Sequence, residues 1–305
     1  MIHYNPHRWT HHFFDVRGSL VKQILPRTLF CFAVAALWIG AIRFLDVGLS
    51  IPPTLHGLIG PALSLLLVFR TNASYDRFWE GRRLWGSIVN DCRNLARQSR
   101  IAFAKDSQAH QEFLAWVQLF PVLAMRKLRG ESDPKTLKLP SLAKKALDAD
   151  SVLRVVKSSS PPLSACARMT ELLARPEYTQ SLVNSLALEN AIGRLIDSIG
   201  GCERIHKTPL PFAYVVHLRR ALILYFCSLP LALESTLGWG TPFAVALIAY
   251  IFFGIEEIGV EIEDPFEDDP NDLPLERICG TIESNVASMQ FESFQPEEVE
   301  SSSAH

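Results

Sequence analysis

The stretch Gly57–Trp85 reads GLIGPALSLLLVFRTNASYDRFWEGRRLW, and the interpretation of the whole chain depends on it. Its first half, Leu58–Phe69, is apolar and carries no charge. From Arg70 the stretch becomes amphipathic, and no helix breaker marks the change. We therefore predict one helix that begins in lipid and continues into water, with Leu58–Phe69 lining a pore.

Composition excludes several classes of protein. The chain has 305 residues, 48% of them hydrophobic and 20% charged, and its net charge of −2 gives no indication of a nucleic-acid partner. None of the six cysteines forms a CxxC pair, so neither a disulfide framework nor a zinc site is predicted. Met1–Lys22 lacks the short apolar core and cleavage site of a secretory signal.

Four apolar segments are candidates for crossing a membrane: Thr28–Leu45, Leu55–Phe69, Phe212–Leu233 and Thr241–Ile255. Leu55–Phe69 is short for a span, which fits a helix that faces a pore or partner chains rather than lipid on all sides. The alternative is a soluble all-α protein with several buried helices, because short apolar runs are often core helices.

Basic residues flank these segments on one side only. The loops Asp46–Thr54 and Glu234–Gly240 contain no Lys or Arg, whereas the other flanks carry several. This distribution predicts that both termini are cytoplasmic.

The remaining sequence is predicted to be helical. Trp9–Leu25 has the pattern of an amphipathic interfacial helix that ends at Pro26, and Gln111–Leu128 has Phe113, Trp116, Val117 and Phe120 on one face as core candidates. The expected organisation is an interfacial helix (1–27), two membrane segments (28–85), a helical cytosolic domain (86–207), two further membrane segments (208–262), an acidic cytosolic segment (263–294) and a disordered tail (295–305).

Three motifs resemble those of one family, the bestrophins, and in particular their bacterial homologues. The motifs are RFW at Arg77–Trp79, GCERI with TPLPFAY in Gly201–Tyr214, and EDPFEDDPNDLPLE at Glu263–Glu276. The resemblance implies an all-α homopentameric ion channel in a bacterial inner membrane, through which monovalent ions pass without a cofactor. Five second membrane segments would surround a hydrophobic neck, and a cytosolic vestibule would end in a second constriction.

Position by position, the resemblance places the neck at Pro61, Leu65 and Phe69 and the cytosolic constriction at Leu186. Pro61 departs from the aliphatic or aromatic residue expected at the top of the neck. From the residues alone, all four would be ordinary packing or lipid-facing side chains.

The acidic run has two interpretations. In animal bestrophins the corresponding segment binds calcium, but here Pro270 and Asn271 interrupt it, its spacing is not that of an EF-hand, and bacterial relatives are not expected to need calcium. We interpret it as a structural belt and keep calcium as the alternative. The belt comprises Asp264, Glu267, Asp268, Asp269 and Asp272.

Selectivity and two other functions stay open at this point. Animal members of the family pass anions, whereas some bacterial members resemble monovalent-cation channels, and an apolar neck suits either. A membrane-anchored scaffold or sensor is the main alternative function. An intramembrane enzyme would use His217 with Glu256 or Glu257, but no catalytic motif supports it, so the sequence predicts that the protein is not an enzyme.

Overall fold

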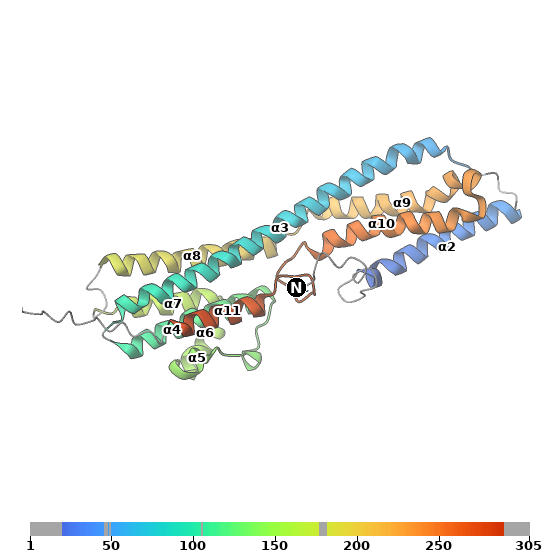
Figure 1. Ribbon diagram of the computed structural model, residues 1–305. Coiled ribbons are helices and arrows are strands. Elements are labelled where there is room, and N and C mark those ends of the chain that lie inside the picture. Colours follow the sequence, from blue (N-terminus) through green and yellow to red (C-terminus); the bar gives the residue numbers. More distant parts are fainter. Residues whose placement is uncertain (1–19, 46–47, 49, 105, 177–181, 290–305) are drawn as a thin grey trace, which may run out of the picture. The chain divides into compact units, whose positions relative to one another are not determined.

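The computed structural model describes residues 20–45, 48, 50–104, 106–176 and 182–289, and within them it contains helices and no strand (Figure 1). The predicted all-α class is thereby confirmed for this part of the chain. Two compact units are distinguished: residues 1–82 with 204–273, and residues 83–203 with 274–305. The expected disordered tail lies outside the described residues.

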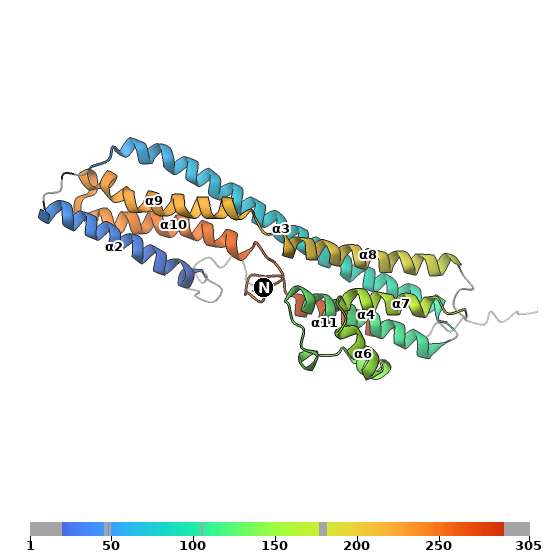
Figure 2. The same ribbon diagram turned by 180° about the vertical axis from the view of Figure 1, so that it is seen from behind.

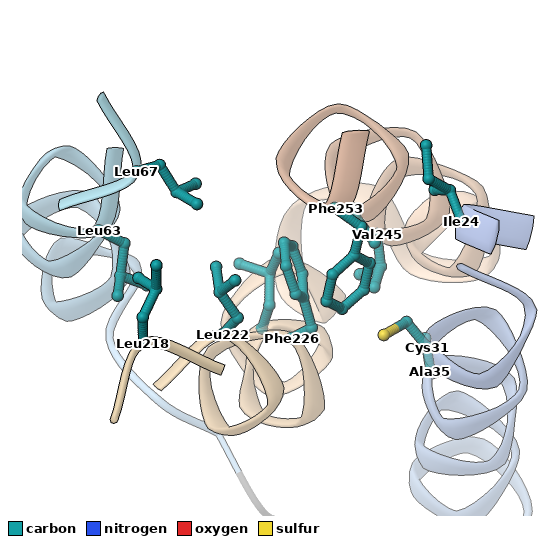
Figure 3. Close-up of a cluster of buried hydrophobic side chains, with 12 residues drawn as sticks. Ile24, Cys31, Ala35, Leu63, Leu67, Leu218, Leu222, Phe226, Val245 and Phe253 are labelled. Carbon is teal, nitrogen blue, oxygen red and sulfur yellow. The ribbon is translucent and has the colours of Figure 1, made fainter. Parts of the chain in front are cut away.

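The first unit is a bundle of apolar helices. It contains α2 (Val21–Leu45), the N-terminal part of α3 (Pro53–Ala102), α9 (Phe212–Leu237) and α10 (Thr241–Glu261), with α10 packed against α2 and α9 (Figures 1 and 2). Its core consists of side chains spaced mostly four apart, so that each helix buries one face (Figure 3). The core residues are Ile24, Cys31, Ala35, Leu63, Leu67, Leu218, Leu222, Phe226, Leu229, Val245, Ala249 and Phe253.

The predicted continuity of the second segment is confirmed. α3 runs through 50 residues, includes all of Gly57–Trp85, and does not break where the sequence changes from apolar to charged. Within the described residues, three helical stretches are long and apolar enough to span a membrane: Val21–Leu45, Pro53–Ala102 and Phe212–Glu261. The third stretch comprises α9 and α10, which lie side by side in both views and are joined by the short 3-10 helix Gly238–Gly240.

The expected end of the first helix at Pro26 was wrong. Pro26 lies inside α2, which begins at Val21 and continues to Leu45. A proline in a helix removes one N–H donor and leaves a backbone carbonyl without its helical partner. Transmembrane helices tolerate proline because neighbouring groups can form hydrogen bonds with that carbonyl. The greater part of the predicted interfacial helix, residues 9–19, lies outside the described residues.

The second unit is also helical. It contains the remainder of α3, then α4 (Ser107–Leu128), α5 (Ser141–Ala146), α6 (Ala149–Val156), α7 (Pro161–Leu173), most of α8 (Leu182–Lys207) and α11 (Leu275–Ser288). Its core includes the four candidates on α4, since Phe113, Trp116, Val117 and Phe120 are at most 1% exposed.

The helix α11 lies within the expected acidic segment 263–294, for which the sequence interpretation named no helix. It buries Leu275, Cys279, Ile282 and Val286 and packs against α4, where the Gln118 side-chain amide donates to the Glu283 carbonyl at 2.9 Å. These four residues have helical spacing, but the acidic residues directly before them dominated the interpretation of the sequence.

Candidate functional site

The N-terminal half of α3 has a buried face and an exposed face. Leu63 and Leu67 are 4% and 1% exposed and point from α3 into the bundle core (Figure 3). Leu65 and Phe69 are 54% and 58% exposed, and Pro61 is exposed as well. At about 100° per residue, Pro61, Leu65 and Phe69 lie on the side of the helix roughly opposite the core. These three residues, which we call the α3 stripe, therefore have no role in the core of this subunit.

The exposed face of α3 becomes polar directly after the α3 stripe. Asn72 and Asp76 lie three and seven positions after Phe69, which keeps them on the same side of the helix, and both are exposed. Sequence reasoning missed these two residues, although the same spacing that related Leu65 to Phe69 would have found them.

Leu186 lies on α8 in the second unit, and its side chain is 59% exposed. On the same helix, Leu188, Ile192 and Leu195 are at most 1% exposed and form its core-facing side. Leu186 therefore does not belong to the core of its unit, in contrast to the ordinary packing role that its sequence context favours.

A cluster of charged side chains in the first unit surrounds Glu256 of α10. Arg70 is 1% exposed, and its Nη1 donates to Glu256 Oε1 at 2.6 Å and to the Glu256 carbonyl at 3.2 Å. Glu256 is itself 2% exposed, so this is an ion pair removed from water. Such a pair is costly to break, because either partner alone would be a buried unpaired charge.

Two further arginines bind the same carboxylate. Arg219 Nε donates to Glu256 Oε1 at 2.9 Å, and Arg27 Nη1 donates to Glu256 Oε2 at 3.1 Å and to Glu257 Oε2 at 2.6 Å. These contacts join α2, α3, α9 and α10. We call the five residues that make them the arginine cluster: Arg27, Arg70, Arg219, Glu256 and Glu257. Glu256 thus binds arginines, and no hydrogen bond within the described residues joins it to His217.

The arginine of the RFW motif holds backbone carbonyl groups. Arg77 Nε donates to the Glu263 carbonyl at 2.8 Å, its Nη2 donates to the Ile205 carbonyl at 2.7 Å, and its Nη1 donates to the Thr208 carbonyl. Ile205 lies in the last turn of α8, where carbonyls lack helical partners. The motif therefore has a structural explanation, which is to fix α3 to the two segments that carry the other motifs.

The acidic segment is held by local contacts. His206 Nδ1 lies 2.6 Å from Asp264 Oδ2, Glu263 Oε1 accepts the Leu210 N–H at 2.9 Å, and Asp272 Oδ2 accepts the Asp269 N–H at 2.8 Å. Within the described residues, no three or more His, Cys, Asp or Glu side chains are grouped so that they hold a metal ion.

Asp272 is the most buried carboxyl group of this segment. It is 2% exposed, and its Oδ1 has no hydrogen-bond partner within the part of the chain that the structure describes. The pKa of Asp272 is raised to about 7, mainly by burial and also by nearby carboxylates including Asp269 and Glu267, while the hydrogen bond from the Asp269 N–H acts in the opposite direction.

This pKa predicts a dependence of stability on pH. An unfolded aspartate has a pKa of about 3.9, so between about pH 4 and 7 the folded state retains a proton that the unfolded state loses, and stability falls as pH rises. We expect Asp272→Asn to reduce the drop in melting temperature between pH 6 and pH 8. Asp268→Asn, which removes an exposed carboxylate from the same segment, is expected to leave that drop unchanged. An equal drop in the Asp272→Asn variant and the wild type would contradict the assignment.

The acidic segment also packs closely against α3 at Gly81. A Cβ atom at Gly81 would lie 2.9 Å from Pro265 Cγ and 3.0 Å from two ring carbons of Phe266. We expect Gly81→Ala to destabilise the protein by about 1–3 kcal/mol through overpacking. As a control, Gly193→Ala on α8 has no atom within 4 Å of the added Cβ and is expected to stabilise by about 0.5–1 kcal/mol. Thermal unfolding of the two variants in detergent tests the difference, and equal effects would contradict it.

The described residues form helices, some of them apolar and of membrane length, and α3 carries an exposed apolar stripe. This combination is typical of a membrane protein. The sequence profile described as "Bacterial/Fungal Bestrophin protein" matches residues 1–288. The chain therefore belongs to the bacterial and fungal bestrophin family.

The chain is similar to other proteins over most of its length and of theirs. The chain is 39% identical to the voltage-dependent anion channel-forming protein of Nostoc sp., with 91% of this chain and 90% of that protein covered. It is 38% identical to the protein of the same description from Synechocystis sp., with 93% and 92% covered. A mutated bacterial bestrophin homologue of Klebsiella pneumoniae has a solved structure with 29% identity and a TM-score of 0.79, covering 88% of this chain and all of that one.

Proposed function

We propose that this protein is an anion channel in which several copies of α3 surround the pore. The α3 stripe carries the proposal: Leu65 and Phe69 are more than half exposed on a helix whose opposite face is buried, in a member of the bestrophin family. Rings of apolar side chains gate by excluding water, so the stripe would form the neck. The protein is a channel rather than an enzyme.

Five copies arranged around one axis are the proposed assembly, as the resemblance to bestrophins implies. Each copy would cross a bacterial inner membrane four times, through α2, the N-terminal part of α3, α9 and α10. The absence of Lys and Arg from the loops 46–54 and 234–240 supports cytoplasmic termini. Native mass spectrometry of the detergent-solubilised protein tests the assembly, because any number of copies other than five would contradict it.

Leu186 is proposed to line a second, cytosolic constriction, and its exposure of 59% supports this role. The acidic belt formed by Asp264, Glu267, Asp268, Asp269 and Asp272 is proposed to be structural, since Asp264 and Asp272 make the local contacts described above. Calcium would then have no effect on the current, which titration of calcium during bilayer recordings tests.

The reversal potential in a salt gradient tests whether the channel passes anions. The names of the relatives from Nostoc and Synechocystis favour anions. With purified protein in a planar bilayer and a gradient of NaCl, the reversal potential is expected to have the sign of the chloride equilibrium potential. The opposite sign would identify a monovalent-cation channel instead, and an absence of flux in liposomes would favour a membrane-anchored scaffold.

A further inference from the structure

A cavity opens beside the arginine cluster, between α2, α9 and α10. Its volume is about 290 Å³, and one part of its wall is charged while the other is apolar. The lining residues are Arg27, Arg219, Leu222, Ile223, Phe253 and Glu256.

The two arginines at this cavity have hydrogen-bond donors to spare. The side chains of Arg27 and Arg219 are 40% and 50% exposed, whereas Glu256 is 2% exposed. Arg27 contacts the carboxylates through Nη1 and Arg219 through Nε, although a guanidinium carries five N–H donors. The other donors of both side chains have no hydrogen-bond partner within the described residues. The accessible charge of the cavity is therefore positive.

The cavity also lies at one end of the apolar stretches of α2 and α9. Arg27 and Arg43 are 16 positions apart on α2, or about 24 Å, with no charged residue between them. On α9, Arg219 and Glu234 are 15 positions apart, or about 22 Å, and Arg43 pairs with Glu234 at 2.8 Å at the far end. Two charged layers thus enclose an apolar region that approaches the hydrocarbon thickness of about 30 Å. In a bilayer that surrounds this apolar region, the layer that contains Arg27 and Arg219 would lie at the level of the lipid headgroups.

We propose that this cavity binds an anionic phospholipid. The phosphate would accept hydrogen bonds from the free donors of Arg27 and Arg219, because the planar guanidinium matches phosphate oxygens. One acyl chain would lie against Ile223, which is 38% exposed, where the buried Leu222 and Phe253 form the floor of the cavity behind it. A free phosphate ion would leave this apolar wall in contact with water, so a lipid fits the two parts of the cavity better.

The proposal is tested by melting the detergent-solubilised protein with phosphatidylglycerol, with phosphatidylcholine or with inorganic phosphate. Phosphatidylglycerol is expected to raise the melting temperature of the wild type, whereas the other two are expected to have little effect. This increase should disappear in Arg219→Gln and return in part in Arg219→Lys, which restores the charge. Arg220→Gln is the matched control, because Arg220 is exposed on the same helix but does not line the cavity.

Two further measurements keep the test decisive if Arg219→Gln does not fold. Ile223→Trp would fill the apolar wall without changing any charge, and it is expected to abolish the stabilisation by phosphatidylglycerol. Mass spectrometry of the purified protein should find phosphatidylglycerol retained by the wild type and lost from Ile223→Trp. Equal stabilisation by inorganic phosphate, or an unchanged response in Arg219→Gln and Ile223→Trp, would overturn the proposal. Neither readout requires ion flow, so this proposal can fail without affecting the proposed channel function.

Discussion

Glu256→Gln is expected to destabilise the protein more than any other single substitution in the arginine cluster. The change preserves the size of the side chain but removes the carboxylate that Arg70 binds at 2.6 Å, and it leaves a guanidinium that is 1% exposed with a neutral partner. Breaking a buried ion pair from one side costs about 3–5 kcal/mol. Glu263 does not restore the pair, because its Oε2 lies 3.9 Å from Arg70 Nη2 and its other oxygen accepts the Leu210 N–H.

Glu257→Gln is the matched control. Glu257 is the neighbouring residue and pairs with Arg27, whose side chain is 40% exposed and retains its contact with Glu256. Although Glu257 is 8% exposed, its partner Arg27 is partly open to solvent and stays paired with Glu256, so this variant should lose clearly less stability than Glu256→Gln. The measurement is the unfolding temperature in detergent, together with the fraction that elutes as a single species. Similar losses in both variants would show that Arg70 does not depend on Glu256.

Phe69→Ala is expected to raise the single-channel conductance severalfold, and Phe69→Ala combined with Leu65→Ala should raise it further. Both side chains are more than half exposed on the face of α3 that is opposite the core, so truncating them should leave the fold intact. If they form the neck, each truncation widens an apolar ring and lowers the cost of keeping water inside it. Recordings of purified channels in a planar bilayer provide the measurement.

Leu247→Ala is the control for these variants. Leu247 is 63% exposed, comparable to Leu65 and Phe69, but it lies on α10 and not on α3. It should leave the conductance unchanged. If Phe69→Ala behaved like Leu247→Ala, the assignment of the neck to the α3 stripe would be wrong.

The features of the fold that were predictable are those that depend on nearby residues. The continuity of α3 and the core face of α4 follow from helical periodicity, which a sequence displays directly. The continuation of α2 through Pro26 could not be predicted from the local sequence, because the packing of a helix overrides the local effect of a proline. The helix α11 was missed because its apolar spacing follows a strongly acidic run.

The arginine cluster illustrates what the sequence alone could not provide. Arg70 and Glu256 are 186 residues apart, and nothing in the pattern around either residue names the other. Sequence reasoning treated Arg70 as a flanking charge and Glu256 as an alternative catalytic group. Only the packing of α3 against α10 shows that one side chain neutralises the other.

The shared carboxylate limits how the subunit can move. Phe69 directly precedes Arg70 in α3, and Arg70 is joined through Glu256 to α10 and, by way of Arg219 and Arg27, to α9 and α2. A backbone clamped at this level cannot slide along its own bundle unless these bonds break together. In the proposed channel, the aperture at Phe69 would therefore change by rotation of the phenyl ring or by tilting of the whole protomer.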